Sequence, residues 1–235
     1  MANDNIILDV SDPPNDLSYV DFEDYYAIEL LKVNNIEVSE QSLITELNNR
    51  ETVLQGASAH ALGNMGSTAA IQELKQLCTI SEDLVKVEAA YALARIGVSE
   101  YRNTLKECLN YPVHAYLGPS IAAGDLARLG DSIGFPVLSK CFQINNLIIR
   151  AIACKQIILF LPFQNTLTGN GQKVDAYALF EQALHDSHPE VQRIALVQMR
   201  ELRTPKIRNL LKNYLLTTAD EYLKNIARNL LKQMT

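Results

Sequence analysis

Leu93-Ala94-Arg95-Ile96-Gly97 and Leu126-Ala127-Arg128-Leu129-Gly130 are two copies of one short motif, 33 residues apart. Leu62-Gly63-Asn64-Met65-Gly66 is a looser copy that begins 31 residues before the first. A period of roughly 20–50 residues indicates a repeat architecture. Extending this register along the chain gives six units, with anchor positions at Leu54, Val85, Gly118, Ile149, Val191 and Leu223.

Three further columns follow the anchors in every unit. Four residues on there is always a small residue: Ser58, Ala89, Ala122, Ala153, Ala195 and Ala227. Eight residues on there is a large apolar residue: Leu62, Leu93, Leu126, Ile157, Met199 and Leu231. Eleven residues on there is another: Met65, Ile96, Leu129, Phe160, Leu202 and Met234. These offsets lie on one helical stripe, so each unit is predicted to contain a helix whose buried face repeats from unit to unit.

A second helix is predicted between each of these repeated helices. Gly66, Gly97 and Gly130 follow the last apolar column of the first three units, where a left-handed glycine ends a helix. Ser67, Ser99 and Asp131 are then residue types that cap the next helix. The intervening helices are expected at residues 67–78, 99–109, 131–142, 175–185 and 204–216. No sustained period-two alternation predicts a strand.

The sequence therefore predicts an all-α fold, a right-handed α-α superhelix of about six helical hairpins. The register resembles HEAT repeats, especially the short kind found in bacterial proteins and in phycobilisome lyase subunits. Val85-Lys86 and Ala90-Tyr91-Ala92-Leu93-Ala94-Arg95-Ile96-Gly97 match that pattern best. The resemblance covers about residues 40–235, and it weakens at Gly118-Pro119 and in the fourth and fifth units, which lack the terminal glycine. It implies an armadillo-like α-solenoid, a fold that serves many functions.

The ends and one insertion depart from the repeat. Residues 1–20 are predicted to be a poorly ordered acidic arm, and residues 21–235 a single solenoid domain. Residues 22–33 are expected to form a helix that caps the stack, or alternatively an aromatic arm that docks a partner. The fourth and fifth anchors lie 42 residues apart, which predicts a mobile surface loop near residues 164–173. Such a loop either borders a binding face or is a tolerated extension.

Composition excludes several classes of protein. The net charge of −6 and the absence of tryptophan argue against nucleic-acid binding. The longest apolar-rich run, residues 151–163, is broken by Lys155 and Gln156, so no membrane span is expected. The N-terminus is acidic and lacks the basic region of a signal peptide, so no signal or transit peptide is expected. Four cysteines lie on apolar helix faces, which is typical of buried thiols in a reducing compartment and indicates a cytoplasmic location: Cys78, Cys108, Cys141 and Cys154.

Charge is unevenly distributed along the chain. Residues 1–50 hold eleven Asp and Glu against two Lys and Arg, whereas residues 190–235 hold nine basic and four acidic residues. This asymmetry affects the choice of partner and its steering rather than the fold. It leaves head-to-tail self-association open, and the sequence does not predict an oligomeric state.

The sequence offers little for catalysis. His185-Asp186-Ser187-His188 could be a ligand or triad set, but Asp and Ser are also common at the turn before a helix, and a capping turn is favoured. HEAT-like metal hydroxylases carry His-Glu pairs, and this chain has no His-Glu dipeptide. No phosphate loop, GxSxG or dinucleotide-binding motif is present. We therefore expect no enzyme activity, no cofactor and no metal site.

The remaining candidate is a binding surface. If the repeated helices line the concave side, their outward positions are His60, Asn64, Glu88, Tyr91, Arg95, Asp125, Arg128 and Lys155. Arg95, Arg128 and Lys155 would form a basic ladder beside Tyr91, although a solvated polar face is the simpler interpretation. The favoured function is a protein-binding scaffold or adaptor. A bacterial immunity protein that masks a toxin is one alternative, and the resemblance implies a second, a bilin lyase subunit.

Overall fold

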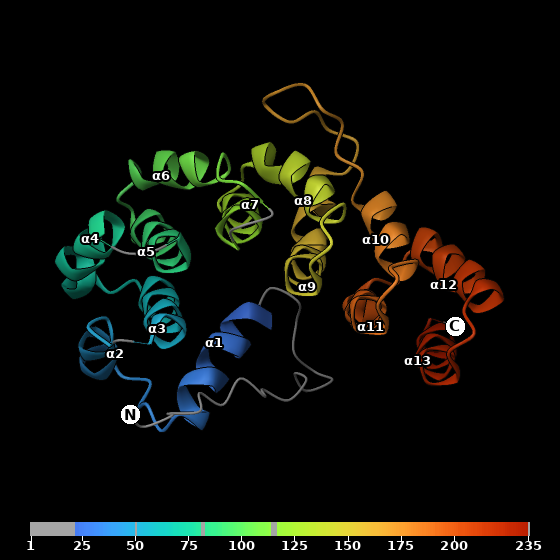
Figure 1. The fold of residues 1–235 in the computed structure, drawn as a ribbon, viewed down its shortest axis with the longest axis horizontal. Coiled ribbons are helices and arrows are strands. Elements are labelled where there is room, and N and C mark those ends of the chain that lie inside the picture. Colours follow the sequence, from blue (N-terminus) through green and yellow to red (C-terminus); the bar gives the residue numbers. More distant parts are fainter. Residues whose placement is uncertain (1–21, 50, 81–82, 114–116, 235) are drawn as a thin grey trace. The chain divides into compact units, whose positions relative to one another are not determined.

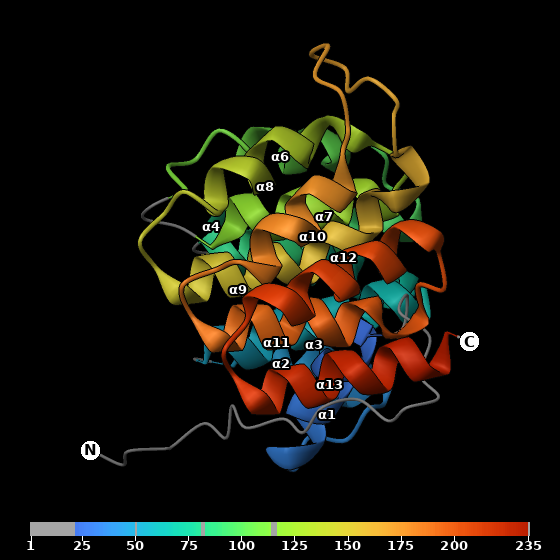
Figure 2. The same ribbon diagram turned by 90° about the vertical axis from the view of Figure 1, so that its right-hand side faces the viewer.

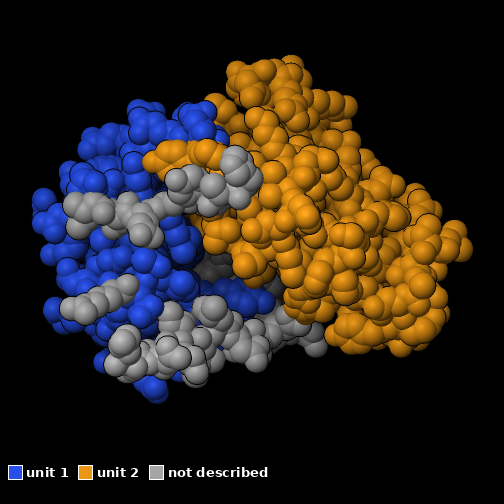
Figure 3. All heavy atoms as spheres, viewed as in Figure 1, with its two compact units in different colours: residues 1–110 blue, residues 111–235 orange. Residues whose placement is uncertain are grey.

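The computed structural model describes residues 22–49, 51–80, 83–113 and 117–234. Within these ranges the regular structure is helical, and the only bridge of β type joins Leu167 and Lys173. The predicted all-α solenoid is therefore confirmed. The helices divide after Asn110 into two compact units (Figure 3). The predicted arm at residues 1–20 lies outside the described residues, and the single domain over residues 21–235 stays a prediction.

The first unit contains six α-helices among its described residues. They are α1 Phe22–Val33, α2 Glu40–Glu46, α3 Thr52–Met65, α4 Ile71–Ile80, α5 Asp83–Ile96 and α6 Tyr101–Cys108. Two antiparallel hairpins, α2–α3 and α4–α5, stack through α3 and α5 (Figure 1). α1 packs against α3 and fully buries Leu31. That position suits a capping helix, and the capping role stays a prediction.

The second unit contains seven α-helices among its described residues. They are α7 Gly118–Arg128, α8 Phe135–Cys141, α9 Leu147–Gln156, α10 Ala176–Leu184, α11 Pro189–Gln198, α12 Pro205–Thr217 and α13 Glu221–Gln233. α8, α10 and α12 form one row of this unit, and α7, α9, α11 and α13 form the other (Figures 1 and 2). The helices that carry the anchor residues are thus the second members of the hairpins.

The predicted columns form the core of both units. All six residues of the small column are 0% exposed: Ser58, Ala89, Ala122, Ala153, Ala195 and Ala227. Small side chains there let neighbouring helices approach closely. At Gly63 the approach of α3 to α5 is close, because a Cβ atom would lie 2.6 Å from the Cα atom of Ala92. α3 and α5 therefore touch through their backbones.

The column eleven residues after the anchors is less buried than predicted. Met65 is 51% exposed, and Ile96 and Leu129 are partly exposed, whereas Phe160 is fully buried. Met65 and Ile96 are the last residues of α3 and α5, and Leu129 directly follows α7, so neighbouring helices cover them on one side only. Phe160 is not at a helix end, because the chain continues beyond α9 in a 3₁₀ segment, Ile157–Phe163, and Phe160 is one of the buried residues of that segment.

Glycine residues mark the C-terminal ends of the repeated helices in the first three units. Gly66, Gly97 and Gly130 have φ of 68°, 113° and 85°, which confirms the predicted left-handed ends. The fourth and fifth units lack this glycine, and there α9 and α11 tighten into the 3₁₀ segments Ile157–Phe163 and Met199–Glu201.

Of the three predicted caps, one is confirmed. The carboxylate of Asp131 accepts a hydrogen bond from the Ile133 N–H at 3.0 Å. The Ser67 hydroxyl makes no capping hydrogen bond, and Glu100 rather than Ser99 occupies the capping position of α6. Residue type alone was therefore a poor guide to where these two helices begin.

The insertion near residues 164–173 forms a turn that is closed at its base by hydrogen bonds, and its predicted mobility stays a prediction. The Asn165 N–H donates to the Val174 carbonyl at 2.9 Å, and the Val174 N–H donates back to the Thr166 carbonyl at 2.9 Å. At its base the Gln164 amide spans Asp175 and Ala176, at 3.0 and 2.9 Å. The segment extends beyond α8 and α10 in Figure 1.

All four cysteines are buried free thiols, as predicted. Burial raises the pKa of Cys78 and of Cys141 to about 12 and also raises the pKa of Cys154, so these thiols stay protonated at neutral pH. In the part of the chain that the structure describes, no helix has the length and apolarity to cross a membrane.

Candidate functional site

The predicted surface residues divide between the two units. α3 and α5 of the first unit carry the α3–α5 cluster: His60, Asn64, Glu88, Tyr91 and Arg95. α7 and α9 of the second unit carry Asp125, Arg128 and Lys155, the α7–α9 set. Because the ladder of Arg95, Arg128 and Lys155 includes residues of both units, it stays a prediction.

A chain of contacts connects α3 to α5 in the first unit. The Nδ1 atom of His60 lies 3.0 Å from Oε2 of Glu88, and the His60 ring stacks on Tyr91 with centroids 5.2 Å apart. Arg95 then donates a hydrogen bond from its guanidinium to the Tyr91 hydroxyl at 3.1 Å. His60 and Tyr91 both stand six residues after their anchors, so equivalent positions of successive repeats meet.

Two residues of this cluster do not face outward as predicted. His60 is 3% exposed and Tyr91 is fully buried. The reason is the close approach of Gly63 to Ala92, which brings the flanking positions of the two helices into their interface. Arg95 is exposed, so its guanidinium is the part of the cluster most open to a partner.

The α7–α9 set is also more buried than expected. Asp125 is fully buried and pairs with Arg128 at 2.9 Å, so its predicted outward position is wrong. At the preceding residue, Gly124, a Cβ atom would lie 1.9 Å from Oε1 of Gln156, which shows that the Gln156 side chain of α9 lies over this part of α7. Offsets along one helix cannot reveal such a covering side chain.

Lys155 is partly exposed and lies close enough to α11 to act on an acidic residue there. The pKa of Glu190 is lowered first by the hydrogen bond from Arg193, and the charge of Lys155 lowers it further. Lys155 therefore belongs to a mixed surface with Glu190 and Arg193 rather than to a purely basic one.

The segment His185–His188 is the predicted capping turn. His188 is the N-cap of α11, and its Nδ1 accepts from the Glu190 N–H at 3.2 Å. Asp186 accepts from the His188 N–H at 2.9 Å. Across the described residues, no three His, Cys, Asp or Glu side chains converge where an ion could bind.

Sequence reasoning missed the role of Arg150, which joins two hairpins. Its guanidinium contacts both carboxylate oxygens of Asp186 at 2.7 and 3.2 Å and donates to the Ile144 carbonyl at 2.9 Å. Both charged side chains are almost fully buried. The signal that could have revealed it is the basic residue directly after the anchor, Lys86 after Val85 and Arg150 after Ile149.

Comparison with known proteins gives a family match for part of the chain. Residues 40–117, which span α2 to α6 and hold the α3–α5 cluster, match the family HEAT repeats. Among solved structures the chain is similar to an engineered protein, a Northeast Structural Genomics Consortium target, at 17% identity and a TM-score of 0.40, over 83% of this chain and 95% of that one. No curated protein matches the sequence.

Proposed function

From the match of residues 40–117 to HEAT repeats, we propose that the chain is a non-catalytic scaffold that binds another protein or peptide through its anchor-bearing helices. HEAT repeats are generally protein-interaction modules, and stacked repeats offer an extended surface without an active site. The further step, to a particular kind of partner, depends on Arg95.

The observation that supports this step is the way Arg95 is held. Its guanidinium is exposed but hydrogen-bonded to the Tyr91 hydroxyl, and Tyr91 is itself fixed by stacking on His60. A side chain that is positioned in advance loses less conformational entropy on binding. Arginine and tyrosine are also enriched among the residues that contribute most to interfaces.

The partner that suits this arrangement is an acidic segment. A guanidinium binds a carboxylate through two parallel hydrogen bonds, which gives both strength and orientation. We therefore propose an acidic peptide or an acidic protein face as the ligand.

The experiment is capture of partners from the native host extract, with identification by mass spectrometry. The variant Arg95→Glu is expected to weaken capture of the principal acidic partner at least about tenfold, as loss of an interface anchor does. Arg102→Glu is the matched control, because Arg102 is exposed on α6 of the first unit. Undiminished capture by Arg95→Glu would refute this partner assignment.

A further inference from the structure

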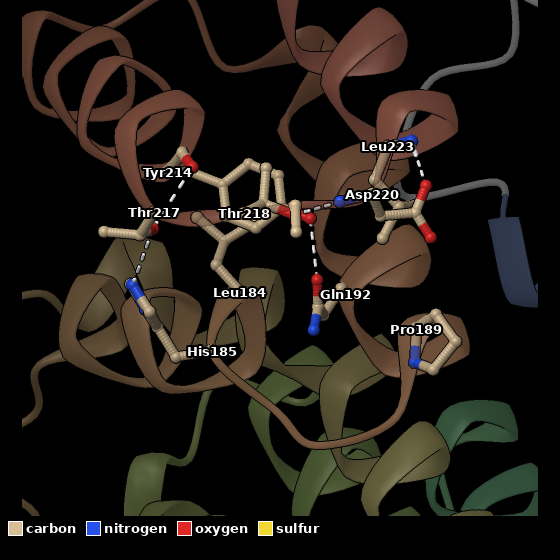
Figure 4. A pocket seen from close by; sticks show the side chains of 10 residues that line it. Leu184, His185, Pro189, Gln192, Tyr214, Thr217, Thr218, Asp220 and Leu223 are labelled. Carbon is tan, nitrogen blue, oxygen red and sulfur yellow. Dashed lines mark hydrogen bonds between the residues drawn. The ribbon is translucent and has the colours of Figure 1, made fainter.

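A cavity of about 400 Å³ opens in the second unit, between the hairpins α10–α11 and α12–α13 (Figure 4). Ends of α10 and α12 and starts of α11 and α13 converge on it. Its polar lining consists of His185, Gln192, Tyr214, Thr217, Thr218 and Asp220. This size suits a single large side chain or a small ligand.

The donors on the floor of the cavity are already engaged with protein acceptors. The Tyr214 hydroxyl donates to Oε1 of Gln192 at 2.7 Å. The Gln192 amide nitrogen donates in turn to the Asp186 carbonyl at 2.7 Å. These contacts hold both side chains in place, and the Thr218 side chain is also hydrogen-bonded to the Tyr214 side chain.

On the wall formed by α10 and α12, the side-chain donors are likewise paired with acceptors of the protein. Nδ1 of His185 lies 2.8 Å from the Glu181 carbonyl, which can only accept, so the proton of the ring is at Nδ1. Nε2 is then an acceptor, 3.4 Å from the Thr217 hydroxyl oxygen. The Thr217 hydroxyl has a backbone acceptor of its own, the Tyr214 carbonyl at 3.2 Å.

Asp220 adds a negative charge at the start of α13. One carboxylate oxygen accepts from the Leu223 N–H at 3.0 Å and caps the helix, while the Asp220 N–H donates to the Thr218 hydroxyl oxygen at 3.3 Å. Burial raises the pKa of Tyr214 most, a hydrogen bond with Thr218 lowers it, and the charge of Asp220 raises it, so the carboxylate acts on the floor of the cavity. The second carboxylate oxygen remains for a ligand.

The lining therefore presents acceptors and one negative charge, with few donors left. We propose that this cavity binds the guanidinium of an arginine side chain that a partner protein presents. Arginine carries five N–H donors in a planar fork and no acceptor, which complements several acceptors spread around one cavity. Leu184, Pro189 and Leu223 supply apolar wall for its aliphatic stem.

The basic residues of this region do not neutralise Asp220 directly. Residues 190–235 hold nine basic and four acidic residues, an excess that would oppose a cation at long range. However, Lys224 and Arg228 contact Glu221 at 2.7 and 3.5 Å. Beyond about 8–10 Å the remaining charges are screened at physiological salt.

This site goes beyond the scaffold function proposed above. It lies on α10 to α13, far along the chain from Arg95, and it takes a ligand of the opposite charge. Arg95 and the cavity can therefore be tested separately: the cavity variants below leave Arg95 in place, and loss of either site leaves the other measurable.

The test is a titration of the isotope-labelled full chain, followed by amide NMR signals, with N-acetyl-arginine amide as the probe. Saturable shifts are expected at Gln192, Asp220 and Leu223. N-acetyl-citrulline amide, which has the same shape without the charge, is expected to bind at least tenfold more weakly. Equal binding of the citrulline probe, saturable binding of N-acetyl-glutamate amide, or no shifts with the arginine probe would overturn the proposal. Tighter binding of free arginine than of the blocked form would overturn the partner-protein part.

Two variants separate the site from general electrostatics. Asp220→Asn keeps an oxygen that caps α13, so the fold is retained, but it removes the charge, and at least tenfold weaker binding is expected. Glu221→Gln removes the same charge from the neighbouring residue, which does not line the cavity, and is expected to change binding less than twofold. If the two variants weakened binding of the arginine probe equally, the probe would be responding to the overall charge of this region, and the proposed site would be refuted.

Discussion

The α3–α5 junction of the first unit and the α9–α11 junction of the second join successive repeats by different chemistry. In the first, Gly63 lies against Ala92 and the rings of His60 and Tyr91 stack. In the second, the buried ion pair of Arg150 and Asp186 crosses between hairpins. One repeat register therefore accommodates both a junction that depends on volume and a junction that depends on charge.

Breaking the charged junction is expected to have the largest effect. Arg150→Met leaves Asp186 buried without its cation, and removing one partner of a buried pair costs about 3–5 kcal/mol. Denaturant unfolding would measure this loss. Arg193→Met is the matched control in the same unit, because Arg193 and Glu190 form a more exposed pair, for which a cost of less than about 1 kcal/mol is expected.

Cys154 provides a local reporter for the same variant. Its Sγ atom lies 3.7 Å from the Val191 carbonyl, within the α9–α11 junction. Thiol labelling at Cys154 should become faster in Arg150→Met and stay slow in Arg193→Met. Similar stability and labelling of the two variants would show that the charged junction does not depend on its ion pair.

The volume-dependent junction can be tested with alanine at two glycines. At Gly63 the new Cβ meets the backbone of Ala92 at 2.6 Å, so the helices must separate, and a loss of about 1–3 kcal/mol is expected. At Gly124 the new Cβ meets the side chain of Gln156, so that a side chain rather than a backbone must shift. There a helix-propensity gain of up to about 1 kcal/mol offsets the clash.

Gly56→Ala is the control for α3 itself. A Cβ atom there would be 3.5 Å from Cγ of Glu88, an ordinary contact, so this variant should be at least as stable as the parent. Thermal unfolding of the three variants should rank Gly63→Ala lowest. If Gly63→Ala were as stable as Gly124→Ala, the backbone contact between α3 and α5 would not be tight.

A smaller effect is expected where helices end. Gly97 has a φ of 113°, which an L-residue with a side chain rarely adopts, so Gly97→Ala should cost at least about 1 kcal/mol. Gly66 has φ 68° and ψ 30°, the left-handed region that asparagine tolerates. The free energy of unfolding should therefore fall by much less in Gly66→Asn than in Gly97→Ala. Equal unfolding midpoints for both variants and the parent would contradict this ranking.

The smallest effect concerns pH and the second unit. The pKa of Glu190 is lowered on folding, chiefly by the Arg193 hydrogen bond. A lowered folded-state pKa gives stability that is present above the unfolded value of 4.5 and lost as pH falls through the folded value. Because the Glu190 side chain is 43% exposed, less than about 1 kcal/mol is expected. Unfolding at pH 6 and pH 3 should show this slope reduced in Glu190→Gln, and an unchanged slope would contradict it.

Much of the fold could be predicted because its signals lie along single helices. The small column is buried in every unit, and residues 22–33 form the expected helix. The intervening helices begin and end within a few residues of their predicted limits. Period, helix-ending glycine and residue size are all local, so one sequence is enough to read them.

The candidate surface was harder to predict because exposure depends on the neighbouring helix. His60 and Tyr91 are buried because Gly63 allows α5 to come close, and the Gln156 side chain of α9 covers Gly124, beside the buried Asp125 in sequence. Arg150 and Asp186 are 36 residues apart, and their pairing follows from the stacking of hairpins. The spacing of residues along one helix gives the direction of a side chain but not what covers it.

The closed turn between α9 and α10 has a practical consequence. Its two stems are held together by the Asn165 and Val174 backbone, and the Gln164 amide fixes the start of α10. Extra length introduced at Gly169 to Gly171 would therefore add to the tip without moving the helices on either side. An epitope, a fluorophore or a cross-linking group could be grafted there, which would give a handle on the molecule that leaves both Arg95 and the arginine cavity unaltered.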